Sequence, residues 1–138
     1  MYSALVDNLT DPESRGDNND WIFSAFPSGN AGKTSWQYPI IVIEPVDISF
    51  KRLTVDPNYS TSKRLEIHSF TIDVYSKSAA VLDSISDDIQ NSLNTISASL
   101  RTNGLKNLEL VGTDYSPPSS EEVKIHNKTF NFEAQRID

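Results

Sequence analysis

The segment from Lys63 to Gly104 constrains the fold most, because two hydrophobic periods follow one another in it without interruption. Its first part, residues 63–76, alternates apolar and polar residues, which is typical of a β-strand with one buried face. The apolar phase changes near His68–Ser69, and this change predicts either a β-bulge or a switch of the buried face. We therefore expect one long strand that leads directly into the next element.

The second part of this segment, residues 77–104, has the period of an amphipathic helix. Its apolar residues are three or four positions apart and form one stripe: Leu82, Ile85, Ile89, Leu93, Ile96 and Leu100. Ser76 or Ser78 can cap the start, and Gly104 can adopt the left-handed conformation that ends a helix. The pattern predicts one long helix of about 23 residues that covers a sheet. Its polar face carries Asp83, Asp87, Gln90, Asn91 and Asn94.

Two further segments before the hairpin tip have the character of strands. Residues 40–44 are a continuous apolar run, which favours a central strand buried on both faces. Residues 46–55 alternate and are followed by turn-forming residues at 56–62, so we expect a long hairpin spanning about residues 46–75. Lys51, Arg52, Lys63 and Arg64 would lie around its outer half, either as charges that protect a sheet edge or as a basic arm that reaches an acidic neighbour.

The C-terminal part predicts two more strands, at residues 105–115 and 121–137, separated by a turn at residues 116–120. The last strand changes apolar phase near Asn127–Lys128, just after an Ile-His pair, as residues 63–76 also do. We therefore expect these two long strands to lie side by side in the sheet.

The N-terminal residues 1–20 predict a short helix followed by a mobile acidic connector, and residues 21–138 predict a single domain. The aromatic residues at 21–26 favour a short strand or a packing plug, with a partner-binding surface as the alternative. The expected fold class is α+β: a mixed or antiparallel sheet of about four to five strands, one long helix on one face and the short N-terminal helix.

Composition excludes several classes of function. The 138 residues include no cysteine, so disulfides, thiolate metal sites and a cysteine nucleophile are impossible. The net charge of −7 disfavours sequence-independent binding to nucleic acid phosphates. No apolar run approaches the ~20 residues that cross a bilayer, and the acidic N-terminus differs from a signal peptide. We expect a soluble cytoplasmic product with no membrane partner.

The sequence also predicts no catalytic residue, cofactor or metal site. Gly32, Lys33 and Thr34 match the end of a phosphate-binding loop, but Pro27 occupies the position of its first glycine. The two histidines, His68 and His126, have no ligand-spaced neighbours. The carboxylate pairs at 87–88 and 121–122 are adjacent in sequence, so their side chains point in different directions. The protein is not expected to be an enzyme.

The order of the expected elements, together with several phrases of sequence, resembles a known family. The phrases are YPIIVIEPVDISF at 38–50, LEIHSFTIDVYSKSAAVLDSISDDIQNSL at 65–93, LKNLELVG at 105–112 and KTFNFEA at 128–134. From about Trp21 to the C-terminus, the chain resembles the tail-terminator, or tail-completion, proteins of long-tailed bacteriophages and related viruses. This group includes related neck and minor-capsid proteins.

The resemblance implies a virion protein of the tail or neck that assembles in the host cytoplasm. Six copies would form a ring at the head-proximal end of the tail tube, stop tube growth and join the tail to the head. The implied partners are other copies of the chain, the tail-tube protein and the head–tail connector or stopper protein, with DNA only passing through the lumen.

The same analogy assigns two sets of contact residues. The first lies on the hairpin and would contact the tube or the next subunit: Lys51, Arg52, Asp56, Asn58, Tyr59, Lys63 and Arg64. The second lies on the helix and would face the lumen or a neighbour: Asp83, Asp87 and Asn94. The alternatives are a head-side stopper or adaptor protein of the neck, a non-viral α+β binding module and, through Lys33, a nucleotide-binding enzyme.

Overall fold

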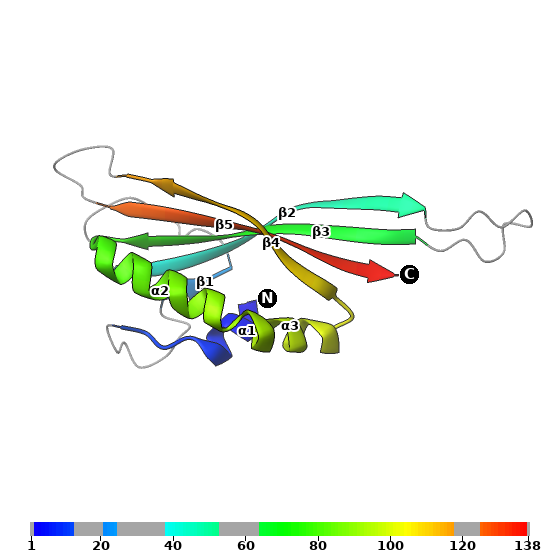
Figure 1. Ribbon diagram of the computed structural model, residues 1–138, viewed down its shortest axis with the longest axis horizontal. Coiled ribbons are helices and arrows are strands. Elements are labelled where there is room, and N and C mark those ends of the chain that lie inside the picture. Colours follow the sequence, from blue (N-terminus) through cyan, green and yellow to red (C-terminus); the bar gives the residue numbers. More distant parts are fainter. Residues whose placement is uncertain (1, 13–20, 25–37, 53–63, 118–124, 138) are drawn as a thin grey trace, which may run out of the picture.

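A five-stranded mixed sheet with helices on one face makes up the described part of the chain (Figure 1). The computed structural model describes residues 2–12, 21–24, 38–52, 64–117 and 125–137. The strands are β1 (Ile22–Phe23), β2 (Ile40–Arg52), β3 (Arg64–Ser76), β4 (Lys106–Ser116) and β5 (His126–Ile137). The helices are α1 (Tyr2–Asn8), α2 (Ala79–Asn91) and α3 (Leu93–Thr102). The α+β class is confirmed.

The strand order is β1-β2-β3-β5-β4, with antiparallel pairing throughout except for β1, which runs parallel to β2. The predicted hairpin is present, because β2 and β3 pair up to Arg52 and Arg64 with a single register shift, and its tip lies outside the described residues. β3 and β5 are neighbours, as predicted. Because they are antiparallel, His68 pairs with Ala134 and His126 with Ser76, so the histidines lie at opposite ends of the pair.

The apolar phase change in β3 is a switch of the buried face and not a bulge. β3 pairs with β5 from Leu65 to Ser76 without a register shift. Strand geometry therefore places Phe70, Ile72 and Val74 on the helix-facing side and Leu65 and Ile67 on the opposite side. The bulge lies in β2, between Pro45 and Asp47. Proline has no N–H for the ladder and is tolerated in strands at such irregularities.

The single long helix was a wrong prediction in one respect, because the helical segment is divided into α2 and α3 at Ser92. Ser92 has φ −90° and ψ −1°, and its N–H approaches the carbonyls of both Asp88 and Gln90. Serine and asparagine, which are weak helix formers, surround this point at residues 91–95. α2 contacts β3 and β5 whereas α3 contacts β4, so the break lets the segment follow the twisted sheet.

The predicted apolar stripe and caps are nevertheless correct. The buried residues of the two helices include Leu82, Ile85, Ile89, Ile96 and Leu100, and Leu93 packs against the same core. Ser78 accepts a hydrogen bond from the Val81 N–H at 3.4 Å, and Gly104 has φ +88°. The stripe therefore packs on the sheet across the break.

The N-terminal residues contribute to the same core. Leu5 of α1 is fully buried, and α1 contacts α3 and β1. Trp21 and Ile22 are buried as well, which confirms the packing interpretation for these two residues, whereas Phe26 lies outside the described residues. Residues 40–43 of the predicted buried strand at 40–44 are buried, whereas Glu44 is exposed. The strands predicted at 40–44 and 46–55 are one strand, β2, because Pro45 and Val46 are accommodated by the bulge. The connector at 13–20 and the loop with Gly32, Lys33 and Thr34 also lie outside the described residues.

Candidate interaction surfaces

Two large apolar side chains on the helix-facing side of the hairpin are about half exposed. Ile48 is 49% exposed and Phe50 is 57% exposed. They pair with His68 and Glu66 of β3, and cross-strand partners share one face, so all four lie on the same side as the core residue Phe70. The core therefore ends along the hairpin, and its apolar surface continues into solvent. We call Ile48 and Phe50 the hairpin patch.

A hollow of about 200 Å³ lies between the hairpin patch and the end of α3. Its apolar lining comprises Ile43, Pro45, Ile48, Phe70, Leu100 and Leu105, and its polar lining Asp47, His68 and Ser69. The His68 Nε2 atom lies 3.1 Å from the Glu66 carboxylate, which fixes the imidazole at the rim. An apolar hollow with a few polar groups at its rim is suited to one large side chain of a partner.

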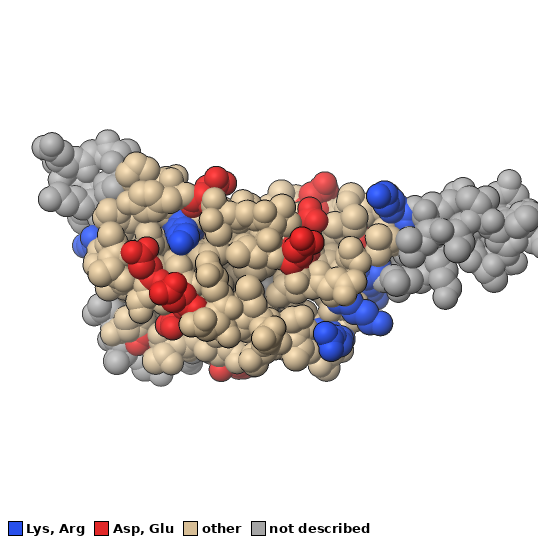
Figure 2. Space-filling model, viewed as in Figure 1, with Lys and Arg blue, Asp and Glu red and all other residues tan. Residues whose placement is uncertain are grey.

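Basic residues surround this end of the molecule. Lys51, Arg101, Lys106 and Arg136 are exposed here. The sheet register joins Lys51 to β5 through Leu65, and Lys106 follows directly from the α3 turn that contains Arg101. Figure 2 shows Lys and Arg atoms gathered next to the hairpin end. We call these four residues the basic end.

The predicted hairpin contacts are only partly described. Lys51 is exposed, and Arg52 and Arg64 are the last pair of the described hairpin. Asp56, Asn58, Tyr59 and Lys63 lie outside the described residues. Sequence reasoning missed Arg101, Lys106 and Arg136 as members of the basic end, because no local pattern connects three residues on three different elements.

The predicted polar helix face is exposed. Asp83, Asp87 and the neighbouring Asp88 lie on α2, and Asn94 lies on α3, beyond the break at Ser92. Acidic atoms form a group over α2 in Figure 2. This surface offers negative charge and amide groups without any large apolar side chain, so it suits water or a polar partner.

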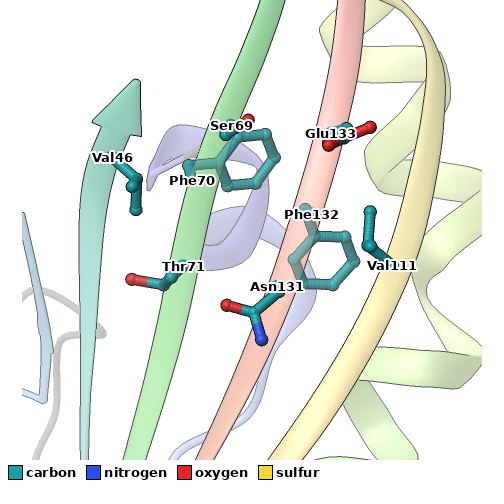
Figure 3. Close-up of a pocket in the computed structure, with 8 residues that line it drawn as sticks. All are labelled: Val46, Ser69, Phe70, Thr71, Val111, Asn131, Phe132 and Glu133. Carbon is teal, nitrogen blue, oxygen red and sulfur yellow. The ribbon is translucent and has the colours of Figure 1, made fainter. Parts of the chain in front are cut away.

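The face of the sheet opposite the described helices carries a second, shallower hollow of about 100 Å³ (Figure 3). Val46 of β2 and Val111 of β4 flank it and are 62% and 56% exposed. Both valines lie at register shifts of their strands. Between them, Thr71 and Asn131 form a directly paired polar centre. Ser69, Glu133, Phe70 and Phe132 also line the hollow, so polar and apolar side chains are mixed between the two valines.

Polar side chains on this face contact one another across neighbouring strands. The Thr129 hydroxyl donates a hydrogen bond to Asp73, 2.5 Å away across β3 and β5. Burial raises the pKa of Tyr75 to about 12, and the negative charge of Asp73 adds to the rise.

Within the described ranges, no three His, Cys, Asp or Glu side chains are grouped to hold a metal ion. None of the described helices has the length and apolar character of a membrane span.

Comparison with known proteins gives no family assignment. Neither the models of known protein families nor the curated protein sequences contain a match to this chain. The functional conclusion therefore depends on the surfaces described above and on the residues that carry the family resemblance.

Proposed function

We propose that this protein is a structural component of a viral tail neck. Copies of the chain form a ring, with six as the expected number, at the head-proximal end of the tail tube. The ring ends tube growth and provides the surface to which the head-side connector binds. DNA passes through its lumen without a dedicated binding site.

The element order supports this proposal. The chain runs from a short helix through a short strand to a long hairpin whose first strand follows Tyr38–Pro39, and then through a helical segment to two final strands. This order is the one on which the resemblance to tail-terminator proteins depends. The broken helix alters one element without changing the order or the face that is covered.

The hairpin patch is the observation that carries the proposal. Two large apolar side chains, each about half exposed, continue the core surface of the domain into solvent. Exposed apolar surface beside a hollow and rimmed by charge is characteristic of a protein interface. An interface of this kind, on a domain whose described helices all cover the same sheet face, supports a protein that repeats within an assembly.

The proposal is tested with tail tubes assembled from the tail-tube protein that the same genome encodes. Purified protein is added, and the tubes are imaged by negative-stain electron microscopy. We expect rings with a central hole in the protein alone, and a ring on one end of each tube that stops further growth. A protein that binds the head-side connector but never a bare tube would instead be a stopper or adaptor. A stable two-fold dimer that binds neither would contradict the neck assignment.

A further inference from the structure

Charge is distributed unevenly along the long axis of the molecule. The basic end lies beside the hairpin. The other half carries exposed acids on α2 and near the end of β4: Asp83, Asp87, Asp88 and Asp114. Figure 2 shows most Lys and Arg atoms next to the hairpin, and a group of Asp and Glu atoms over α2, although neither end carries one sign alone. Asp47, Glu66 and Glu109 lie near the basic end, and Lys77 and Lys128 lie near the acidic one. Two copies placed with like ends together would bring charges of the same sign into contact, which opposes association.

Exposed apolar side chains on the helix-facing side are divided between the same two ends. The hairpin patch and its hollow lie at the basic end. At the far end of β4, Tyr115 is 52% exposed and follows directly after Asp114. Tyr115 pairs with Lys128 of β5, which places it on the side that the described helices cover elsewhere. One end thus offers a hollow and the other an aromatic side chain.

Tyr115 is held in one orientation before any contact forms. Its hydroxyl lies 2.6 Å from His126 Nδ1, and the two rings stack with their centroids 6.0 Å apart. A side chain that is ordered in the free protein loses little conformational entropy on binding. Tyrosine is also among the residues that most often dominate the energy of protein interfaces.

We propose that these two ends form a head-to-tail joint between copies of this chain. Tyr115 of one copy enters the hollow beside the hairpin patch of the next copy. Asp114 pairs with Thr129 and therefore lies on the opposite sheet face from Tyr115, where it faces Lys51 and Lys106 on that same face of the next copy. The joint uses two different surfaces of one chain, and a repeated contact of this type closes into a ring when its rotation allows. This inference rests on the proposed ring and specifies which surfaces build it.

A mixing experiment tests the joint with two variants. The first, Ile48→Ser with Phe50→Ser, loses the hairpin patch, and the second, Tyr115→Ser, loses the aromatic anchor. Each variant alone should associate roughly thirtyfold more weakly than the unmodified protein or worse, the loss typical of a central anchor. Mixed together, with one variant isotopically labelled, they should form one-to-one heterodimers that grow no further, because each retains one working surface. Native mass spectrometry measures the composition.

Val111→Ser is the matched control, because Val111 is as exposed as Tyr115 and lies on the same strand but outside the joint. It should assemble normally. The substituted side chains are exposed, so each variant should still fold. Circular dichroism spectra check this. Rings from both joint variants would overturn this joint while leaving the proposed function intact. Homodimers of Tyr115→Ser through the hairpin patch would also overturn it. An unmodified protein that stays monomeric at every concentration would refute the ring and the joint together.

Discussion

The packing of Phe70 against Phe132 offers a quantitative test of the β3–β5 register. The two residues are direct cross-strand partners, their ring centroids are 5.5 Å apart, and the ring planes differ by only 10°. Phe132 is almost completely buried. Truncation of a buried phenylalanine to alanine costs about 3–5 kcal/mol, which would unfold many domains of this size. Leucine is the better substitution, because it keeps most of the volume.

A double-mutant cycle with Phe70→Leu and Phe132→Leu isolates the contact between the rings. Each single variant should lose about 1–2 kcal/mol of unfolding free energy. The double variant should lose less than the sum, with a coupling of about 0.5–1.5 kcal/mol, the range for aromatic pairs in contact. Urea denaturation followed by circular dichroism measures all four proteins. One low protein concentration is used, because assembly would stabilise the folded state.

The control cycle combines Phe132→Leu with Val74→Ala. Val74 lies four residues along β3 from Phe70, or about 13 Å at the rise of a strand, so its effect should add to that of Phe132→Leu without coupling. Coupling in the control cycle and none between Phe70 and Phe132 would show that β3 and β5 pair in a different register. The placement of the hairpin patch would then be wrong as well.

Three further predictions concern stability and assembly. Tyr75 has a folded-state pKa of about 12, above the ordinary value of 10, so its contribution to stability is complete below pH 10 and is lost as pH rises through 12. Because Tyr75 is partly exposed, the unfolding free energy should fall by only about 1 kcal/mol over this pH range. In urea denaturation at alkaline pH, Tyr75→Phe should abolish this pH-dependent fall. Ser78→Ala removes the cap of α2 and should cost about 0.5–1 kcal/mol in the same assay, whereas Ser78→Asp should retain most of the stability. Lys51→Glu with Arg52→Glu reverses charge on the hairpin and should abolish binding to tail tubes in a sedimentation assay, either by loss of the tube contact or by loss of the ring, which native mass spectrometry of the same variant distinguishes. Asp7→Asn, on the exposed side of α1 and outside both contact sets, should leave binding unchanged.

Local periodicity was sufficient to predict most of the fold. The stripe from Leu82 to Leu100, the hairpin that joins β2 and β3, and the adjacency of β3 and β5 all follow from residue spacing. Each of these features is decided by which residues need burial. Residues that need burial recur every three or four positions in an amphipathic helix and every second position in a strand, so the sequence alone reveals them.

The features that were missed depend on geometry beyond one element. The break at Ser92 depends on the twist of the sheet below the helices, and the bulge at Val46 depends on how Pro45 is accommodated opposite β3. Alternation indicates which side chains share a face, but it does not show whether another element covers them. Ile48 and Phe50 therefore had the pattern of a buried strand and are nevertheless exposed.

The central claim is that this chain builds a ring, and the mass of the purified protein tests it most directly. Native mass spectrometry over a series of protein concentrations should give a principal species of six chains, each of 15.4 kDa, with few intermediates, because closure of a ring makes the last contact favourable. A principal species of two chains that does not change with concentration would contradict the account and would indicate a two-fold binding module instead.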